Sequence, residues 1–358
     1  MKIERNKNLK DYNQYGVEAK AKYFVEISTK KEIVDVLKSE YSKDNLLILG
    51  DGNNILFTKD FDGLIIKPNL KGRKIVEEND DFVLVEMASG ENWDEFVKWA
   101  VKNSYQGIEN MILIPSSIGG AVSQNIAAYG QNIMDVVTKV YAIEIETGEE
   151  KEFEHKDCEF KYRESIFKKK FKNKYIITSA VFKLNKVVKE LETSYHERKS
   201  RYGSLEDELK SFAKEPYTIH NVMTAVINQR NKKLPSVSEY GTCGSVFANP
   251  TISKEKYLEL SKIISELQSY PVDKLQYTIK EWDKINDNYV KIPAGRIIDE
   301  LGWRGKWERN VGVYDKHALC IVTNRKANGK DIYEFLENIR NDVKKHYDID
   351  LEYEINII

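Results

Sequence analysis

The sequence has 358 residues, a length typical of two or three domains and sufficient to bury a large core. Apolar residues make up 41% and charged residues 32%, and 56 Lys and Arg nearly balance 57 Asp and Glu. No global field therefore attracts nucleic acid or an anionic membrane. The N-terminal segment lacks the apolar stretch of a signal peptide, and no apolar run is long enough for a membrane span. We expect a cytoplasmic protein that neither binds nucleic acid nor inserts into a membrane.

Cysteine and histidine give no sign of a cross-link or a metal centre. The three cysteines, Cys158, Cys243 and Cys320, are far apart and form no C-x-x-C pattern. The five histidines are scattered and lack the spacing of a metal-binding motif such as H-E-x-x-H. The sequence therefore predicts neither disulfide bonds nor a bound metal.

The first elements in chain order alternate strand and helix. Short apolar or alternating runs bounded by Gly, Asn or Asp predict strands at 22–27, 46–50, 63–67 and 82–87. Apolar positions spaced by three and four residues predict a helix over 29–43, with Thr29 as its N-cap. This part of the chain is mixed α/β in character.

The middle of the chain is predicted to form a second α+β block. A helical period covers 91–105. Alternating runs at 136–153 and 174–185 predict strands, with Thr147 and Gly148 as a hairpin turn in the first run. Residues 189–215 are dense in charge and poor in large aliphatic side chains, which favours a solvated helical excursion on the surface.

The last third of the chain forms a separate predicted unit. A helix over 217–235 ends near Pro235, which marks a natural seam. Beyond this seam the pattern predicts helices at 253–268, 294–303 and 329–347, and strands at 318–324 and 351–358.

The stretch ILGDGNNILF, residues 48–57, follows a predicted strand. Gly50 and Gly52 allow a tight turn whose N–H groups could face an anion. The stretch is not a P-loop, because no Gly-Lys-Ser/Thr follows, and Ile55 occupies the place of the third glycine in a Rossmann fingerprint. Two interpretations remain open, a phosphate-binding turn and an ordinary tight turn.

A second stretch, IPSSIGGAVSQNIAAYG, covers 114–130 and contains no charged residue. Its small side chains would let a ligand approach the backbone closely, and Gln124 and Asn125 offer amide hydrogen bonds to a flat heterocycle. Together with the first stretch it would suit one elongated pyrophosphate ligand whose phosphates are neutralised by backbone N–H groups. The alternative is an ordinary loop over a helix start.

Several motifs of the chain occur together, and in the same order, in one enzyme family. They are ILGDGNNILF, GIENMILIPSSIGGAVSQNIAAYGQNI, FKYRESIFK, YGSL, KKLP, GSVFANP, AGRIIDELGWRGK, DKHALCIVTN and LEYEINII. From about Asn8 to the end the chain thereby resembles the UDP-N-acetylenolpyruvoylglucosamine reductase family. The excursion at 189–215 resembles the tyrosine-bearing loop of the first type of that family.

The resemblance implies an α+β architecture and a reaction. The implied fold has an FAD-binding part of the vanillyl-alcohol-oxidase type in two subdomains, 1–70 and 71–236, and a C-terminal α+β substrate-binding domain, 237–358, whose last strand returns to the active site. The implied enzyme carries non-covalent FAD. It uses NADPH to reduce UDP-N-acetylglucosamine enolpyruvate to UDP-N-acetylmuramate in peptidoglycan synthesis.

The resemblance also assigns roles to residues of this chain. Arg163 matches the catalytic arginine, Glu354 the glutamate that works beside it on the substrate carboxylate, and Ser245 the serine that protonates the carbanionic intermediate. The implied cofactor-binding residues are Gly50, Gly52, Asn53, Asn54, Pro115, Ser116, Ser117, Gly119, Gly120, Gln124, Asn125, Ala128, Tyr129 and Gly130. The implied substrate-binding residues are Tyr202, Arg230, Lys233, Asn249 and His317.

The chain departs from the family pattern at several positions. Asn53, Ser116 and Ala127 replace a serine and two glycines. If the family uses a positive φ at 116 or 127, each β-carbon costs on the order of 1 kcal/mol. An acid, a proline and an arginine are common where this chain has Asn132, Tyr353 and Asn356. Three alternatives therefore remain: a paralogue acting on a related sugar nucleotide, a flavin oxidase, and a catalytically silent sugar-nucleotide-binding protein.

Overall fold

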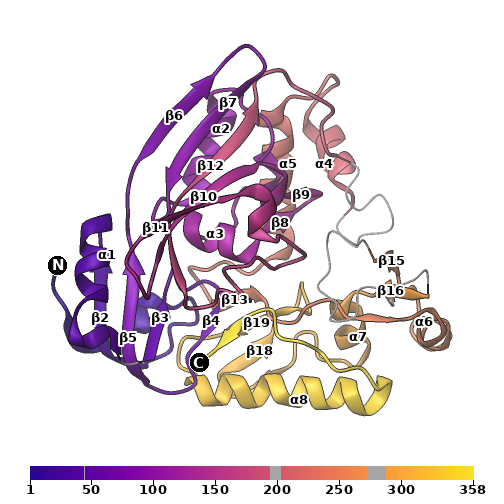
Figure 1. The fold of residues 1–358 in the computed structure, drawn as a ribbon. Helices are drawn as coiled ribbons and strands as arrows, with labels where there is room; N and C mark the ends of the chain where they lie inside the picture. The colour runs from indigo at the N-terminus through magenta and orange to yellow at the C-terminus, as the bar shows by residue number, and fades with distance from the viewer. Residues whose placement is uncertain (44, 194–202, 273–287) are drawn as a thin grey trace. The chain divides into compact units, whose positions relative to one another are not determined.

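The computed structural model describes residues 1–43, 45–193, 203–272 and 288–358 (Figure 1). The chain folds into two compact units, each assembled from separate pieces of sequence. The first unit comprises Met1–Asn6, Lys22–Asp51 and Asp62–Lys232, and the second comprises Lys7–Ala21, Gly52–Phe61 and Lys233–Ile358. The three-part division with boundaries at 70 and 236 stays a prediction.

The first unit contains a four-stranded sheet in the order β1-β2-β5-β3, of which β1, β2 and β5 each have residues that belong to the second unit. Its strands are β1 (Glu4–Asn8), β2 (Lys20–Ile27), β5 (Phe61–Pro68) and β3 (Asn45–Ile48). Helix α1 (Lys30–Leu37) begins as predicted at Thr29, whose side chain accepts the N–H of Glu32. It ends earlier than predicted and is followed by a separate 3₁₀ turn, Glu40–Lys43. The predicted strands at 22–27, 46–50 and 63–67 are confirmed.

A five-stranded antiparallel sheet, in the order β11-β10-β12-β7-β6, forms the second layer of this unit (Figure 1). Its strands are β11 (Glu150–Glu154), β10 (Val137–Glu144), β12 (Tyr175–Asn185), β7 (Phe82–Ala88) and β6 (Arg73–Glu78). The hairpin between β10 and β11 turns at Thr147 and Gly148 as predicted, with Gly148 at φ +73°. The sequence analysis did not predict β6, because every residue of this edge strand is exposed and its apolar residues do not alternate with polar ones.

Helices cover this sheet and build the largest core. They are α2 (Trp93–Lys102), α3 (Ile118–Gln124), α4 (Leu205–Phe212) and α5 (Ile219–Lys233). Trp93 and Phe96 of α2 pack on Phe182 of β12, with ring centroids 5.9 and 5.1 Å away. Helix α5 ends two residues before Pro235, which confirms the predicted stop.

The prediction of a merely solvated helical excursion at 189–215 is wrong for α4. Leu205 and Leu209 lie one turn apart on this helix and are buried in the core of the first unit. Two leucines at this spacing form an apolar stripe too narrow to stand out among the surrounding charges. Residues 194–202 lie outside the described part of the chain.

The second unit is built on a four-stranded antiparallel sheet in the order β13-β19-β18-β17. Its strands are β13 (Gly241–Ser245), β19 (Cys320–Thr323), β18 (Val311–Val313) and β17 (Trp307–Glu308). Helix α8 (Gly329–Tyr347) contributes Phe335, Leu336 and Ile339 to the core of this unit, and α7 (Ala294–Glu300) contributes Ile297 and Ile298. The predicted strand at 318–324 and the helices at 294–303 and 329–347 are confirmed.

Smaller elements complete both units. Strands β14 (Thr251–Ser253), β16 (Tyr289–Lys291) and β15 (Tyr270–Pro271) form a three-stranded sheet, and β20 (Asn356–Ile357) pairs in parallel with β4 (Ile55–Leu56). A two-stranded pair joins β8 (Ala127–Ala128) to β9 (Gln131–Asn132). Further 3₁₀ turns lie at Lys10–Tyr12, Glu109–Met111, Ile133–Asp135 and His155–Cys158.

Two predicted elements of the second unit, like α1 in the first, are much shorter than expected. Helix α6 covers only Lys254–Leu260 of the predicted 253–268, because the Ser261 hydroxyl donates to the Leu258 carbonyl and competes with the helical bonding. Ile264 and Leu267 nevertheless stay buried, so the apolar period outlasts the helix. The predicted strand 351–358 is reduced to β20, since the segment changes partner: Tyr353 bridges Phe247, whereas Asn356 and Ile357 pair with β4.

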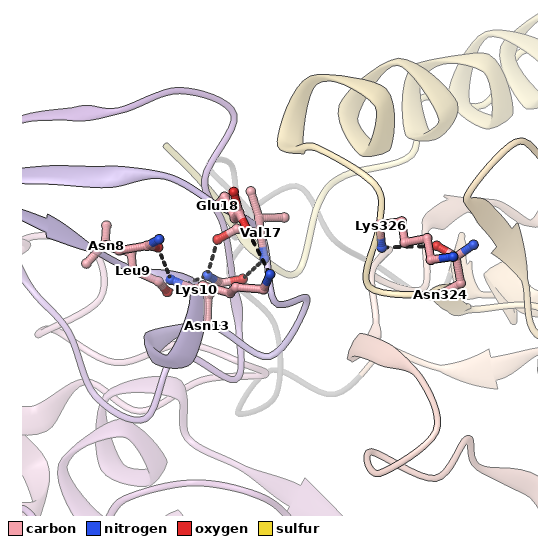
Figure 2. A network of polar contacts seen from close by, with 8 residues as sticks. All are labelled: Asn8, Leu9, Lys10, Asn13, Val17, Glu18, Asn324 and Lys326. Atoms are coloured by element: carbon pink, nitrogen blue, oxygen red, sulfur yellow. Dashed lines mark hydrogen bonds and ion pairs between the residues drawn. The ribbon is translucent and has the colours of Figure 1, made fainter.

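The N-terminal piece of the second unit is held by the side chain of Asn13 (Figure 2). Its amide donates to the carbonyls of Leu9 and Val17 at 2.7 and 3.0 Å, and its oxygen accepts the N–H of Val17 at 3.0 Å. Lys10 and Glu18 close the same turn on the outside with an ion pair of 2.7 Å. One buried amide thus bonds to three backbone groups of this turn, of which the Leu9 carbonyl also accepts the N–H of Tyr12.

A polar cluster joins α8 to the C-terminal segment of the second unit. The Tyr353 hydroxyl donates to the Glu337 carboxylate at 2.5 Å, and Arg340 donates to the same oxygen at 2.7 Å and to the Leu351 carbonyl at 2.9 Å. The Tyr353 ring stacks on the Phe247 ring, with their centroids 5.4 Å apart. The Arg340 guanidinium lies 4.9 Å from the centroid of the Tyr353 ring. The residue before Glu354 is therefore fixed both by stacking and by hydrogen bonds.

This cluster predicts a pH-dependent stability. Burial raises the pKa of Glu337, but the hydrogen bonds from Tyr353 and Arg340 outweigh burial and hold the pKa below its ordinary value. A lowered carboxyl pKa contributes stability above the ordinary value of about 4.3, and this contribution disappears as the pH falls through the lowered pKa. We expect Glu337→Gln to cost about 1–2 kcal/mol at pH 7 and to flatten the loss of stability between pH 5 and 3.

Urea unfolding of the wild type and of Glu337→Gln at several pH values measures this difference. Glu334→Gln is the control, since Glu334 lies on the same helix and its carboxylate forms an exposed ion pair with Lys330. A Glu337→Gln protein with the same free energy of unfolding as the wild type at pH 7 would contradict the assignment.

Candidate functional site

The 114–130 stretch forms a short helix with its flanking turns in the first unit. Ser117 is the N-cap of α3, and its hydroxyl accepts the N–H of Gly120 at 3.3 Å. The carbonyl of Ser116 accepts the N–H of Trp93 at 2.9 Å, and Pro115 is exposed just ahead of these residues. The stretch is thus anchored to the start of α2 as well as capped by its own serine.

Within this unit Gly50, from the stretch 48–57, lies beside the stretch 114–130. A β-carbon placed on Gly50 would lie 3.1 Å from the Ser117 hydroxyl and 3.9 Å from the Gly120 Cα. A β-carbon on Gly120 would lie 3.0 Å from the Ser116 hydroxyl. The glycines therefore leave a narrow cradle of backbone and small hydroxyl groups that larger side chains would fill.

The first N–H groups of α3 all donate hydrogen bonds. The N–H of Ile118 donates to the Glu91 carbonyl at 2.9 Å, and that of Gly119 donates to the Ser89 carbonyl at 2.8 Å. Since the N–H of Gly120 bonds to Ser117, all three groups have partners in the protein itself. These three N–H groups are thus engaged within the protein, and neutralisation of phosphates by backbone N–H groups of the two stretches stays a prediction. Periodicity and composition contain no information about which way a backbone N–H points.

Gln124 supplies a test of whether this cradle suits a ligand. Its Nε2 is buried and has no hydrogen-bond partner within the described residues. A buried amide without a partner costs about 1–3 kcal/mol, and such a cost is accounted for when a ligand completes the bond. The small-residue cradle and this donor fit a flat heterocycle with a phosphate tail, which is the shape of FAD.

Gly52, Asn53 and Asn54 belong to the second unit. Gly52 has φ +68°, and a β-carbon there would approach the Tyr12 carbonyl oxygen to 2.0 Å, so only glycine fits. Asn53 is half-buried. Asn54 donates its side-chain amide to the Glu354 carbonyl at 3.2 Å, and its own carbonyl accepts the N–H of Asn356 at 3.0 Å.

In this unit Ser245 precedes the residue whose backbone bonds to Glu354. Two residues of β13 oppose one residue of β19 between the Thr242 and Ser245 pairs, and Gly244 within this bulge has φ +71°. The bulge turns Ser245 out of the regular alternation of the strand. The next residue, Val246, accepts the N–H of Glu354 at 2.8 Å. Backbone pairing thus fixes a hydroxyl and a carboxylate that are more than a hundred residues apart in sequence.

Arg163 lies in the first unit on a tight turn. Lys161 and Glu164 exchange both backbone hydrogen bonds, at 2.9 and 3.0 Å, and Arg163 between them has φ +56°. This left-handed conformation is rare outside glycine, asparagine and aspartate, and is found where the surroundings require it. The guanidinium donates to the Ala127 carbonyl at 3.0 Å and lies 5.5 Å from the Tyr162 ring. Arg163 therefore contacts the 114–130 stretch directly.

Asn125 is buried at the end of α3, and both ends of its amide bond to backbone groups. Its oxygen accepts the N–H of Met134 at 3.1 Å, and its nitrogen donates to the Lys161 carbonyl at 2.7 Å. These partners differ from the heterocycle expected from the sequence, because a pattern of residue types does not reveal which segment packs beside them.

The segment after α3 is held by residues that the sequence analysis did not single out. Asn110 is buried and donates to the Tyr129 carbonyl at 2.7 Å, and its N–H donates to the side chain of Gln131 at 2.9 Å. Glu109, also buried, accepts the Gln131 amide at 2.9 Å. A polar pair inside the apolar run GIENMILI was the available signal, since buried polar groups need partners.

Tyr129 and Gly130 make the tight turn between β8 and β9. They have φ +47° and +85°, and a β-carbon on Gly130 would approach the Glu192 side chain to 2.4 Å. Ser116 and Ala127 are not among the described residues with positive φ. The conditional cost of a β-carbon at 116 and 127 therefore does not arise in this chain.

The residues assigned to the substrate fall into both units. Arg230 on α5 donates to the Leu113 carbonyl at 3.0 Å, and Lys233 is the last residue of the same helix. Asn249 accepts the N–H of Ala294 at 2.9 Å, at the start of α7. The Nδ1 of His317 accepts the N–H of Leu319 at 3.3 Å. Tyr202 lies outside the described residues.

The cysteines offer no nucleophile. All three are free thiols and buried. Burial raises the pKa of Cys158 and of Cys243 to about 12, against which the hydrogen bond from Cys243 to the Ile55 carbonyl has little effect. At neutral pH these two thiols are protonated and unreactive.

None of the helices in the described ranges has both the length and the apolar character of a membrane span.

Comparison with known proteins gives two family matches along the chain. Residues 21–154 match a family described as FAD binding domain, and residues 236–358 match UDP-N-acetylenolpyruvoylglucosamine reductase, C-terminal domain. The solved structure of UDP-N-acetylenolpyruvylglucosamine reductase from Thermus caldophilus has a TM-score of 0.65 at 19% identity, and the match covers 100% of this chain and 99% of that one. At this identity the likeness establishes the shared fold, an α+β fold with an FAD-binding part.

Curated relatives are similar over the whole length. The chain is 40% identical to a UDP-N-acetylenolpyruvoylglucosamine reductase of Flavobacterium johnsoniae, with 100% of both chains covered. It is 34% identical to the enzyme of the same name from Bdellovibrio bacteriovorus, with 99% of both chains covered. Identity of this extent over complete chains means that the protein belongs to the UDP-N-acetylenolpyruvoylglucosamine reductase family.

Proposed function

We propose that this chain reduces UDP-N-acetylglucosamine enolpyruvate to UDP-N-acetylmuramate with NADPH and FAD, a step of peptidoglycan synthesis. The observation that supports it best is the backbone hydrogen bond from Glu354 to Val246, the residue after Ser245, in the second unit. Asn54 of the glycine-rich stretch donates to the Glu354 carbonyl. A hydroxyl and a carboxylate next to a cofactor stretch are the groups that this reaction needs.

The cradle in the first unit is the proposed binding site of non-covalent FAD. Gly50, Ser116, Ser117 and Gly120 would allow the pyrophosphate to approach the backbone, and the buried Nε2 of Gln124 would donate to the heterocycle. The remaining proposed contacts come from Gly52, Asn53, Asn54, Pro115, Gly119, Ala128, Tyr129 and Gly130, and from the backbone alone of Asn125, whose side-chain amide is engaged by Lys161 and Met134. The chemistry supplied by bound FAD is transfer of a hydride from NADPH to the terminal carbon of the enolpyruvyl group.

Arg163 and Glu354 are assigned to the charge that the reduction creates. Addition of a hydride to the terminal carbon leaves negative charge on the adjacent carbon and its carboxylate. A guanidinium held in advance stabilises that charge without reorganisation at the moment of reaction. The turn that fixes Arg163 and its bond to Ala127 support this assignment, since both hold the guanidinium in advance. Glu354 is proposed to bind and polarise the substrate carboxylate together with Arg163.

Ser245 is the proposed proton donor. The charged carbon next to the carboxylate needs one proton to complete the product. A hydroxyl is a weak acid, but a carbanion is a strong enough base to take its proton when the two are held in contact. The bulge at Gly244 supports this role, because it presents Ser245 outside the regular strand alternation.

The UDP-sugar is proposed to be held by Tyr202, Arg230, Lys233, Asn249 and His317, with most of its contacts in residues 237–358. Cationic groups suit the diphosphate, and an amide suits the polar edges of the ligand. We further propose that 189–215 is the tyrosine-bearing loop of the first type of this family. NADPH and a UDP-sugar as substrates, and the balanced charge of the chain, support a cytoplasmic enzyme that does not bind nucleic acid.

Replacing Ser245 should separate the two half-reactions. We expect Ser245→Ala to leave the reduction of the flavin by NADPH unchanged and to slow its reoxidation by the enolpyruvyl substrate by about 10²–10⁴-fold, the range of general acid catalysis. Anaerobic rapid mixing, followed by flavin absorbance, measures each step separately. Ser261→Ala, in an exposed turn of the same unit, is the control. Equal slowing of both steps would remove Ser245 from the proposed role.

Replacing Gln124 should have opposite effects on stability and on cofactor affinity. Gln124→Met removes a buried donor that has no partner in the described part of the chain, so the apoprotein should be as stable as the wild type or more stable. Loss of one hydrogen bond to FAD should weaken FAD binding roughly ten-fold. Thermal unfolding of the apoprotein and titration with FAD by flavin fluorescence measure the two effects.

Gln229→Met is the matched control for this experiment. Gln229 is also buried in the first unit, but its amide donates to the Ser204 carbonyl and to Glu208 at 3.3 and 3.4 Å. Its replacement should lower the stability of the apoprotein and leave FAD affinity unchanged. A Gln124→Met protein that loses stability and keeps its FAD affinity would place the cofactor elsewhere.

A further inference from the structure

The amide of Asn125 joins three separate segments of the first unit. Asn125 is the C-cap of α3, in a left-handed conformation with φ +45°, and only 2% of its surface is exposed. Its oxygen accepts the N–H of Met134 and its nitrogen donates to the Lys161 carbonyl at 2.7 Å. The sequence analysis assigned this residue to cofactor binding, whereas in the structure both ends of its amide bond to backbone groups.

The segment that Asn125 holds is the turn that carries Arg163. Lys161 and Glu164 close this turn with two backbone hydrogen bonds, so the position of the Lys161 carbonyl determines where Arg163 begins. The guanidinium of Arg163 then donates to the Ala127 carbonyl, two residues beyond Asn125. The end of α3 therefore fixes both the base and the tip of the Arg163 side chain.

A second side chain ties the same turn to the same helix. The hydroxyl of Ser165 donates to the Ser123 carbonyl at 2.7 Å, and Ser165 is 1% exposed. Glu164, also buried, forms an ion pair of 2.8 Å with Lys169. The turn is thus held at Lys161 and at Ser165, the positions that flank Arg163 on either side, and both bonds end on α3 or its cap.

We infer that Asn125 and Ser165 are positioning residues for Arg163 in the reduction of the substrate. The inference rests on the proposed function, in which charge develops beside Arg163 only after the hydride has been transferred. A displacement of about 1 Å at a catalytic group costs on the order of 10²-fold in rate. Loss of either tie should therefore slow the step that needs the guanidinium and leave the step that does not need it unchanged.

The test compares the half-reactions of Asn125→Gly and Ser165→Ala with those of the wild type. Glycine tolerates φ +45°, so the first variant removes the amide without backbone strain. We expect reoxidation of the flavin by the enolpyruvyl substrate to fall about 10- to 100-fold, and the reduction by NADPH and the FAD affinity to stay unchanged. Ser165→Ala removes the other tie, and it decides the question by itself if Asn125→Gly does not fold.

Asn103→Gly is the matched control. Asn103 is the C-cap of α2 in the same unit, and its amide likewise donates to a backbone carbonyl, that of Trp99 at 2.8 Å, but in an exposed position. This variant loses the same kind of bond at the same place in a helix. It should keep wild-type rates in both half-reactions.

A double-mutant cycle separates positioning from a general loss of structure. In an Arg163→Ala background, Asn125→Gly should slow reoxidation no further, because the group that it positions is already absent. Slowing of the same size in both backgrounds, or equal slowing of both half-reactions, would overturn the inference. So would wild-type reoxidation in both single variants. If the reduced wild type is not reoxidised by the enolpyruvyl substrate at all, the proposed function itself fails.

Discussion

Side chains that bond to the backbone of distant segments hold the candidate groups of this protein in place. In the first unit the amide of Asn125 connects the end of α3 to the turn of Arg163 and to Met134. Each of these bonds contributes only about 1 kcal/mol to stability. Their importance is geometric, because a left-handed turn around Arg163 persists only where its surroundings determine it.

In the second unit, backbone pairing holds the candidate groups in place. Residues after Ser245 pair with the segment before and at Glu354, and Asn54 bonds to the carbonyl of Glu354. Tyr353 is fixed in turn by Phe247, Glu337 and Arg340. Short strands of two or three residues would be weak by themselves. Here they are supported by α8, whose apolar face supplies much of the core of this unit.

Much of the fold could be predicted from the sequence, because it depends on local signals. The N-cap at Thr29, the hairpin turn at Gly148 and the stop before Pro235 each follow from the chemistry of one residue. The edge strand β6 could not be predicted, since its exposed residues carry no period. The buried Leu205 and Leu209 were hidden among charges for a similar reason.

The candidate site, like the fold, could be predicted from the sequence only in part. Composition identified the stretches 48–57 and 114–130, and the structure brings Gly50 against Ser117. The partners of individual hydrogen bonds could not be predicted from the sequence. The N–H groups at the start of α3 bond to Ser89 and Glu91, and Asn125 bonds to Lys161. Such bonds join segments 25 or more residues apart, and no spacing rule for helices or strands covers them.

The most direct test of the account is the stoichiometry of anaerobic turnover. The purified yellow protein is mixed with a known amount of NADPH and an excess of UDP-N-acetylglucosamine enolpyruvate, and the sugar nucleotides are measured by mass spectrometry. The account predicts one UDP-N-acetylmuramate, two hydrogen atoms heavier than the substrate, for each NADPH consumed. NADPH consumption that requires oxygen and leaves the sugar nucleotide unchanged would contradict it, as would a colourless protein that binds the sugar nucleotide and does not take up FAD.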